Sequence, residues 1–302
     1  EKSPVELDLP KARVFHDTGF TYIRDSWKWY GEAGGGDIVL QLQSGGGGKA
    51  RSHQHFDKNS FTLFAKGEYF ITEPGHSCYR GKSHHEYDTR TGNHNTVSID
   101  GKNQFLDFAE RGMLHDEVKP YTSHNNRAEV VSKAFYDEID YIASCGRKCY
   151  IPYLNEYTRK IWFVDHEYFI IWDRVDANNQ PGSINSGFNL NNYDGKLECC
   201  INNGKIQVSR PKADMFIQFA APAGISFETA EGRLHTAYHI LPEKSVEGRD
   251  GSAVRINLKV GDEELKAVDF VYVICPLDKR AEAPRLTVVE VVYCKENPNM
   301  FD

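Results

Sequence analysis

Short segments in which apolar and polar residues alternate recur along the chain. The segment 38–43 reads Ile-Val-Leu-Gln-Leu-Gln and is followed closely by a run of glycines. Because successive side chains of a strand point to opposite faces of a sheet, this alternation predicts a strand with one buried face. Shorter runs of the same kind predict further strands at 61–65, 96–100, 205–209 and 215–220.

Two pairs of β-rich runs predict hairpins. The short polar pair Asp-His separates the runs 160–164 and 167–175, and Gly-Asp opens the turn between 253–260 and 267–275. A short polar connection between two β-rich runs is typical of a hairpin. In both cases the two runs are therefore expected to be antiparallel neighbours in one sheet.

One segment, 127–141, is predicted to be a helix. Some of its apolar residues fit a period of 3.6, namely Val130, Val131, Ala134, Phe135 and Ile139. Valine and isoleucine also suit strands, so two strands around a loop stay open as the alternative for this segment.

Many short strands with frequent turns predict an all-β fold, a large two-layer antiparallel β-sandwich of the supersandwich kind. The content of 16 Tyr and 17 Phe favours the same class, because aromatic side chains suit a half-buried pleated surface. With 302 residues and no Pro- or Ser-rich linker, we expect one domain over 1–302. A smaller β subregion over about 205–302 is the alternative division.

Charge and hydropathy exclude two classes of partner. The formal net charge of −7 argues against a surface that coats nucleic acid, so we expect no nucleic-acid partner. No apolar run approaches the roughly 20 residues of a membrane helix, so we expect no membrane insertion. Seven cysteines without a CxxC pair leave at least one outside any intrachain disulfide.

Candidate chemistry concentrates in the first third of the chain, which holds seven of the twelve histidines. His53 and His55 are separated by one residue, so on a strand both imidazoles point to the same face. Glu73 and His94 are of the residue types that zinc binds in its tetrahedral nitrogen and oxygen sites. Spacing alone leaves a second interpretation open, in which the two histidines simply face solvent on an edge strand.

The order and spacing of several motifs in this region resemble the β-sandwich part of heparinase II/III-like polysaccharide lyases. The resemblance is densest over 12–104, and a looser similarity continues at 159–175. The motifs are Phe-His-Asp-Thr-Gly at 15–19, Arg-Asp-Ser-Trp at 24–27, His-Gln-His-Phe-Asp-Lys-Asn-Ser-Phe at 53–61, Glu-Pro-Gly at 73–75 and His-Asn-Thr-Val at 94–97.

This resemblance implies a structural zinc site made by His55, Glu73 and His94, with His53 facing the substrate cleft as a catalytic residue. The family usually has Asp where this chain has Glu73, so the carboxylate is kept on a longer arm. Members of the group place a catalytic tyrosine in this region, for which the candidates are Tyr79 and Tyr87. The side chains expected to contact substrate are those of Arg24, Gln54, Arg80 and Asn95.

The resemblance also implies an activity, the β-elimination of a uronate-containing acidic polysaccharide or oligosaccharide such as a glycosaminoglycan or alginate. In that reaction the C5 proton is removed and the C4 oxygen leaves. The resembling enzymes take their remaining catalytic residues from an α-helical toroid, which we expect upstream or on another chain. The 302 residues alone are therefore expected to be inactive, and the location to be periplasmic or extracellular.

Two other functions stay open. A noncatalytic carbohydrate-binding module would stack sugars on aromatic residues such as Trp27, Trp29, Tyr30, Trp162 and Trp172. A cupin-type metal enzyme also uses two histidines one residue apart, followed by Glu and a further His. Cupins place that carboxylate within a few residues of the pair, whereas Glu73 lies well downstream.

Overall fold

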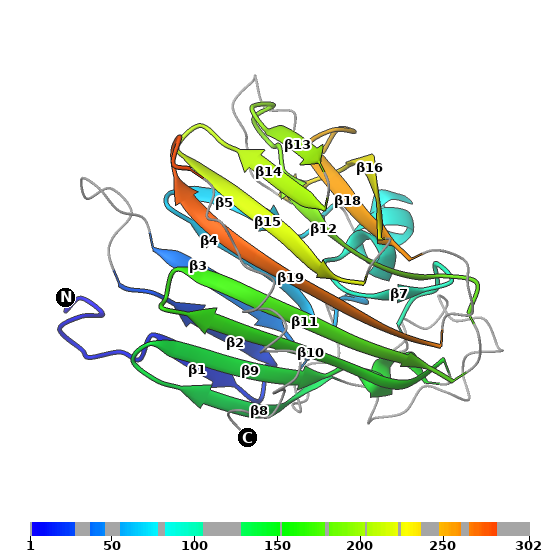
Figure 1. The fold of residues 1–302 in the computed structure, drawn as a ribbon, viewed down its shortest axis with the longest axis horizontal. Coiled ribbons are helices and arrows are strands. Elements are labelled where there is room, and N and C mark those ends of the chain that lie inside the picture. Colours follow the sequence, from blue (N-terminus) through cyan, green and yellow to red (C-terminus); the bar gives the residue numbers. More distant parts are fainter. Residues whose placement is uncertain are drawn as a thin grey trace.

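Two antiparallel sheets packed face to face make up the computed structural model of the chain (Figure 1). The description covers residues 2–27, 37–45, 55–77, 82–104, 128–151, 153–178, 181–202, 204–222, 225–236, 248–260 and 266–282. Within these residues almost all regular structure is β, so the predicted all-β two-layer sandwich is confirmed. None of the described helices is long and apolar enough to cross a bilayer.

The first sheet has nine strands within the described residues. Their order is β1 (Ala12–Phe15), β2 (Phe20–Arg24), β3 (Ile38–Gln43), β4 (Ser60–Ala65), β5 (Glu68–Thr72), β12 (Ile184–Asn191), β18 (Ala253–Lys259) and β16 (Ser226–Gly232), with β7 (Ser98–Ile99) beside β12. The predicted strands at 38–43 and 61–65 are therefore present. At 96–100 the strand is shorter than predicted, because the chain turns at Asp100, whose φ is 51°.

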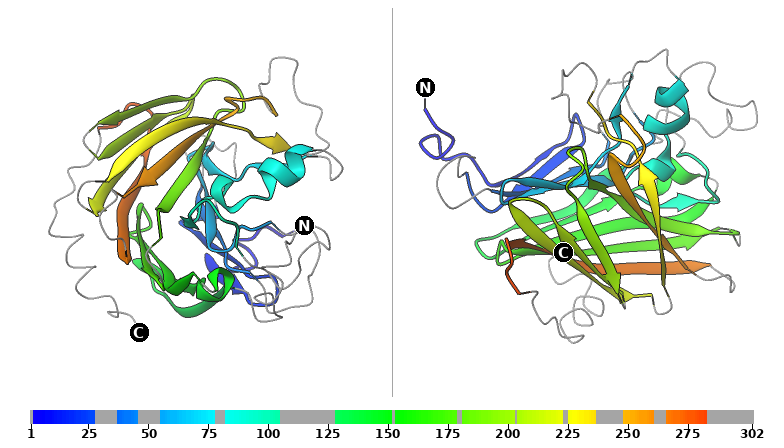
Figure 2. Two further views of the ribbon diagram at one scale, coloured as in Figure 1. Left: turned by 90° about the vertical axis from the view of Figure 1, so that its right-hand side faces the viewer. Right: turned by 90° about the horizontal axis from the view of Figure 1, so that it is seen from above.

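The second sheet has eight strands within the described residues. Their order is β13 (Glu198–Asn202), β14 (Lys205–Ser209), β15 (Ala213–Ala221), β19 (Ala267–Asp278), β11 (Tyr168–Ala177), β10 (Leu154–Val164), β9 (Ile139–Cys145) and β8 (Glu129–Phe135). The predicted strands at 205–209 and 215–220 are β14 and part of β15. Strands that follow residue 205 thus occur in both sheets, which curve around a common interior (Figure 2).

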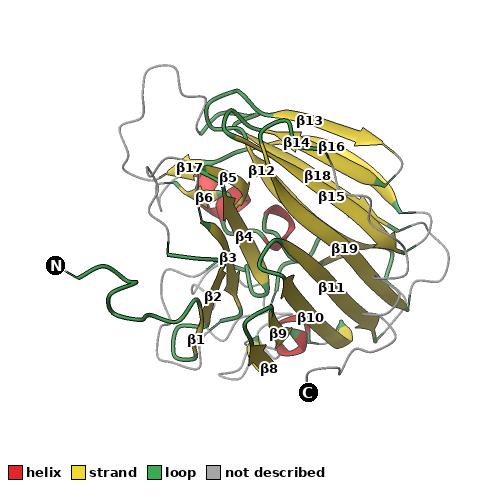
Figure 3. Ribbon diagram, turned by 60° about the vertical axis from the view of Figure 1, so that its left-hand side comes forward, coloured by secondary structure: helices red, strands yellow, loops and turns green. Residues whose placement is uncertain are grey.

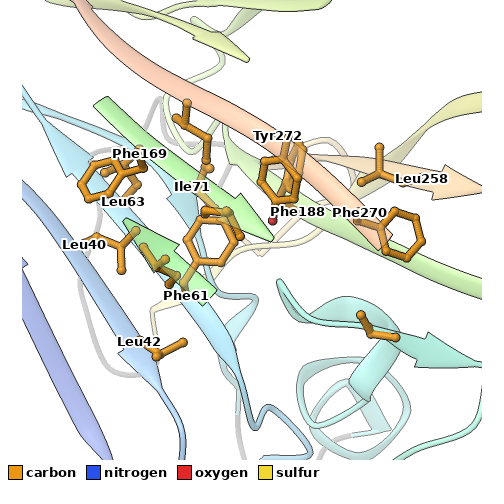
Figure 4. Close-up of a cluster of buried hydrophobic side chains, with 14 of the residues drawn as sticks. Leu40, Leu42, Phe61, Leu63, Ile71, Phe169, Phe188, Leu258, Phe270 and Tyr272 are labelled. Carbon is orange, nitrogen blue, oxygen red and sulfur yellow. The ribbon is translucent and has the colours of Figure 1, made fainter. Parts of the chain in front are cut away.

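Apolar side chains from the facing sides of both sheets fill that interior (Figure 4). Phe61 and Leu63 come from β4, whereas Phe169 and Tyr272 come from the second sheet. All four are almost fully buried, and full burial of one such side chain stabilises the fold by about 1.5–3 kcal/mol. The alternation seen in the sequence therefore marks the side of each strand that faces the core.

The hairpin predicted across 160–175 is confirmed. β10 and β11 are antiparallel neighbours from Val164 opposite Tyr168 to Leu154 opposite Ala177. The turn residues Asp165 and His166 both have positive φ, at 51° and 53°, as a type I′ turn requires. Asp tolerates this conformation better than most residues, which is why the short polar pair was a usable signal.

The hairpin predicted across 253–275 is wrong. β18 lies in the nine-stranded sheet between β12 and β16, whereas β19 lies in the eight-stranded sheet between β15 and β11. Both are interior strands of their sheets, and each pairs on both sides with strands that come earlier in the chain, not with the other. The chain changes sheets between Lys259 and Ala267, and local turn chemistry carries no information about such a crossing.

The helix predicted at 127–141 is also wrong. The segment forms most of the β8–β9 hairpin, in which Phe135 lies opposite Asp140 and the backbone N–H of Tyr136 donates to the carbonyl oxygen of Ile139. A register shift between Val130 and Ser132 interrupts the strict alternation of β8. That irregularity is what produced the partial helical period, and the β-branched residues follow their strand preference.

Short helical segments and a small parallel strand pair lie at one end of the sandwich. They comprise the π-helical η1 (His84–Asp88), the 3₁₀ turns η2 (Thr91–Asn93) and η4 (Arg147–Tyr150), and the pair β6 (Gly75–His76) with β17 (His235–Thr236). Figure 3 shows η1 in red beside β6 and β17, and in Figure 1 it lies close to β16 and β18. These segments carry most of the histidines discussed below.

Candidate metal centre

Four imidazoles gather from segments that are separated in the sequence. The ring centroid of His55 lies 5.3 Å from that of His94, 5.8 Å from that of His84 and 6.2 Å from that of His76. His84 and His94 are 2% and 1% exposed, whereas His55 and His76 are half-buried. The cluster therefore faces the interior of the protein with two rings and is reached from outside past the other two.

Two sets of potential ligand atoms converge within this cluster. In the first set, atoms of His55, Asp57 and His94 lie within 4.8 Å of one another, and in the second the same holds for His55, His76 and His84. We call these the carboxylate set and the imidazole set. His55 belongs to both sets, so its ring lies at the centre of the candidate site.

Buried polar contacts hold the loop that carries His55 and Asp57. Lys58 is almost fully buried, and its ammonium group lies 2.5 Å from the carboxylate of Asp57. The backbone of Lys58 is fixed on both sides, since its N–H donates to Gln104 Oε1 and its carbonyl accepts from the Thr96 hydroxyl. Asn59 then turns the chain into β4 with a φ of 61°.

Glu73 contacts His94 directly. Its carboxylate pairs with Nδ1 of His94, accepts from the Ser60 hydroxyl and lies 3.1 Å from the side-chain nitrogen of Asn95. The other ring nitrogen of His94, Nε2, is buried and has no hydrogen-bond partner within the described residues. A carboxylate on one imidazole nitrogen, with the other nitrogen unused, is the usual arrangement around a metal-binding histidine.

The protonation states of the carboxylate set suit a metal ion. Burial and the neighbouring imidazoles of His94, His84 and His76 lower the pKa of His55 to about 4, so its ring is neutral near pH 7. Burial opposes ionisation of Asp57, but the charge of Lys58 and the neighbouring histidines hold the pKa of Asp57 below its usual value. Neutral imidazole and ionised carboxylate are the forms that bind zinc, so the residues present fit that ion.

The structure brings together only part of the ligand set that the sequence predicted. His55 and His94 do converge, and Glu73 lies against His94 but belongs to neither converging set within the described residues. The carboxylate that converges with the two imidazoles is that of Asp57, which the sequence did not predict. Its position two residues after His55, continuing the same alternation, is the signal that could have identified it.

Four predicted site residues, His53, Gln54, Tyr79 and Arg80, lie outside the described residues.

Asn95, predicted to contact substrate, is fully buried. Its side-chain nitrogen donates to the carbonyl oxygens of Phe61 and Thr72, and its side-chain oxygen accepts from the backbone N–H of Asn189. These bonds tie the loop after His94 to both β5 and β12. The side chain therefore has a structural use and no surface on which a substrate could lie.

Tyr87, a candidate catalytic tyrosine, points toward the segment after β16. Its hydroxyl accepts from the backbone N–H of Arg233 at 2.7 Å, and the Arg233 guanidinium lies 5.7 Å from the ring centroid. Burial raises the pKa of Tyr87 above its usual value, so the phenolate that a base would need is disfavoured near neutral pH.

Arg24, predicted to contact substrate, lies on the outer face of the nine-stranded sheet. It forms an ion pair of 3.2 Å with Asp37, and its guanidinium stacks 3.7 Å from the Trp27 ring centroid. The groove beside it, about 420 Å³ in volume, is lined by Tyr22, Phe64, Tyr69 and others, and by none of the described histidines. Arg24 is therefore not brought to the imidazole cluster.

Sequence reasoning did not select His76, His84 or Asp88 as site residues. Asp88 is fully buried and pairs with His235 Nδ1 at 2.8 Å, and Ser77 donates to it through both its backbone N–H and its hydroxyl. No spacing motif links these positions. The concentration of histidines in this stretch was the available signal.

A family profile and a curated relative both match heparinase-type proteins. A family profile described as heparinase II/III-like, C-terminal, matches residues 8–285. The chain is 25% identical over 291 residues to a protein named heparin-sulfate lyase from Bacteroides stercoris, a match that covers 91% of this chain and 36% of that protein.

Solved structures show the same fold. The heparan sulfate lyase of Pedobacter heparinus has a TM-score of 0.69 at 18% identity, over 92% of this chain and 38% of that one. A heparinase III structure has a TM-score of 0.70 at 21% identity, over 93% and 40% of the two chains. This chain thus spans well under half the length of the relatives it matches. Because the family profile extends over nearly all of its residues, the chain belongs to the heparinase II/III-like C-terminal domain family.

Proposed function

We propose that the chain is the β-sandwich part of a polysaccharide lyase that cleaves a uronate-containing acidic polysaccharide by β-elimination. The observation that carries the proposal is the convergence of His55, Asp57 and His94 directly beside the position of His53 in the sequence. Membership of the family and the name of the Bacteroides stercoris relative support the substrate class. A polymeric substrate of this kind implies a periplasmic or extracellular location.

The chemistry of β-elimination defines what the residues must do. The C5 proton next to the uronate carboxylate is removed, negative charge develops on that carboxylate, and the C4 oxygen leaves with a proton. Such a step needs a base of suitable pKa, an acid and a group that neutralises the carboxylate. In the proposal the His53 imidazole accepts or relays the proton at C5.

The carboxylate set contains His55, which lies two residues after His53 in the sequence. A zinc ion, when bound, would supply a structural crosslink between the loop of His55 and the loop of His94. The residues proposed to hold it are His55, His94 and a carboxylate from Asp57 or Glu73. Glu73 orients the His94 ring through Nδ1, and Lys58 holds Asp57, so the residues on both sides of the ion are themselves positioned.

The remaining catalytic groups are proposed to come from a helical toroid upstream or on another chain. This chain spans 36–40% of the length of the relatives, so the larger part of each relative lies elsewhere. Tyr87 is engaged by Arg233 and has a raised pKa, which leaves Tyr79 or a tyrosine of the helical part for the tyrosine role. We therefore expect the 302-residue chain alone to release no product.

The test is the variant His53→Ala in the full-length enzyme, or in this chain reconstituted with its helical part. Loss of a positioned acid or base lowers turnover by about 10²–10⁴-fold. Release of unsaturated uronate, followed by its ultraviolet absorbance, measures the effect, and circular dichroism checks the fold. His85→Ala is the matched control, because His85 lies in the same region and in neither ligand set. Full turnover by His53→Ala would contradict the proposal.

The alternative functions have less support. Trp162 and Trp172, two of the aromatic residues proposed to stack on sugars, are 2% and 4% exposed. Trp172 also donates its indole N–H to Asp269, so its polar edge is already used. The cupin-type enzyme is disfavoured because the chain belongs to a different family.

A further inference from the structure

The imidazole set, His55, His76 and His84, takes two of its rings from segments other than those that carry Glu73 and His94. His76 is the second residue of β6, which pairs in parallel with β17 so that Thr236 lies opposite His76. Gly75 has a φ of 79°, and a Cβ at this position would lie 1.7 Å from the carbonyl oxygen of His235. Only glycine allows this close approach, so the backbone directly before His76 packs against that of β17.

His84 is held on the first turn of η1, where its side chain is 2% exposed. Its ring centroid lies 4.8 Å from that of His76 and 5.8 Å from that of His55. The last residue of η1, Asp88, places a carboxylate oxygen 4.0 Å from Nδ1 of His84. The rings of His76 and His84 are thus carried by β6 and η1, whose backbones are positioned by contacts with neighbouring segments.

Asp88 connects the segments that carry the imidazole set. It accepts from Ser77, the residue directly after His76, its other carboxylate oxygen lies 2.8 Å from Nδ1 of His235 of β17, and it lies four residues after His84. Asp88 is fully buried, and its carboxylate lies 4.0 Å from Nδ1 of His84, where a negative charge offsets positive charge placed among the rings.

We propose that His55, His76 and His84 form a binding site for a divalent transition-metal ion that prefers nitrogen ligands, such as Ni²⁺, Cu²⁺ or Zn²⁺. Their potential ligand atoms lie within 4.8 Å of one another. Tetrahedral zinc with bonds of roughly 2.0–2.1 Å to nitrogen brings its ligands to about 3.4 Å from one another, so small ring rotations close the site. Three protein ligands leave one position for water or an anion.

The two sets compete for His55. A neutral imidazole has one nitrogen with a free lone pair and binds one ion at a time, so an ion in the imidazole set removes His55 from the carboxylate set. Imidazole ligands suit Cu²⁺, Ni²⁺ and Zn²⁺, whereas the carboxylate set adds a hard oxygen ligand. The position of the ion therefore depends on which metal is supplied. This inference concerns metal binding alone and does not depend on the proposed lyase activity.

The experiment uses the 302-residue chain, stripped with a chelator and dialysed against Ni²⁺ alone. His76→Gln and His84→Gln are each expected to weaken Ni²⁺ binding at least tenfold, whereas His94→Gln changes it less than threefold. His85→Gln is the matched control, because His85 neighbours His84 but lies outside both sets. Thermal melting of each variant checks that it is folded.

A second measurement keeps the test decisive if His84→Gln does not fold. X-ray absorption of the Ni²⁺-loaded unmodified chain reports the number of imidazole ligands, and three are expected. Loss of binding in His94→Gln with unchanged binding in His76→Gln would overturn the proposal. Failure of the unmodified chain to bind Ni²⁺, or a spectrum with fewer than three imidazoles, would do the same.

Discussion

The two ligand sets that share His55 are held in different ways, and we call them the His94 side and the His76 side. On the His94 side, a buried ion pair of the sandwich holds the loops. Arg159 donates to Asp173 through Nε and Nη2, and its Nη1 donates to the carbonyl oxygens of Asn59 and Asn95. On the His76 side, one carboxylate, Asp88, joins three short segments. The His94 side is therefore held by the sheets of the sandwich, whereas the His76 side depends on one residue, Asp88, which we call the local hub.

The largest effect is expected where the sandwich holds the His94 side. Arg159→Met leaves Asp173 buried without its partner, and removal of one member of a buried pair typically costs about 3–5 kcal/mol. The free energy of unfolding in urea measures the loss. The same substitution should loosen the loops around His94, because Arg159 also donates to the carbonyl oxygens of Asn59 and Asn95.

The matched control for that prediction lies next to Asp173 on the same strand. Arg174 pairs with Glu156 at 3.2 Å on the exposed face, where 57% and 41% of the two side chains are accessible. Arg174→Ala should cost less than about 1 kcal/mol, because solvent screens such pairs. Equal losses in Arg159→Met and Arg174→Ala would contradict the role given to the buried pair.

A smaller effect is expected from Asp88→Asn, which keeps the size of the hub and removes its charge. Loss of the charged hydrogen bonds from Ser77 and of the ion pair with His235 should cost about 1–3 kcal/mol in the urea experiment. Ni²⁺ binding by the imidazole set should weaken by about 10–100-fold, as expected when an orienting group is removed. Asp250→Asn, in the exposed pair with Arg233, is the control and should change neither quantity. Unchanged Ni²⁺ affinity in Asp88→Asn would contradict the role of Asp88 in positioning the imidazole set.

The smallest effect is a pH dependence centred on the shared residue. The pKa of His55 is lowered from 6.5 to about 4 in the folded protein, so between these values the unfolded chain binds more protons. The free energy of unfolding of the metal-free protein, stripped with a chelator, should therefore fall as pH drops from about 6.5 to about 4. His55→Gln should show a shallower fall over this window. Identical pH profiles for the two proteins would mean that the surroundings of His55 do not disfavour its charge.

The fold could be predicted where a strand has one buried face and a near neighbour in the sequence. β3 follows strict alternation, and the β10–β11 hairpin has a turn whose residues accept positive φ. The crossing from β18 to β19 could not be predicted, because both are interior strands whose partners lie outside the local sequence. The irregular register of β8 likewise concealed a strand behind a partial helical period.

The candidate site could be predicted only in part. His55 and His94 were found from residue type and motif order, and their rings do converge. Asp57 was not selected, although it converges with both imidazoles, and Glu73 stays a predicted ligand whose carboxylate contacts the His94 ring. The side chain of Asn95 was expected to face substrate, but its hydrogen bonds depend on where β5 and β12 lie, which no local pattern encodes.

The amino-acid sequence by itself determined the all-β class, the buried face of several strands and the concentration of histidines before residue 95. Tertiary structure alone decided which sheet each late strand joins and which imidazoles meet around His55. His76 reaches that cluster through a parallel contact with Thr236, 160 positions away, and Asp88 completes it through His235. Alternation reports only which face of a strand is buried, whereas contacts between distant segments are set by the packing of the whole chain.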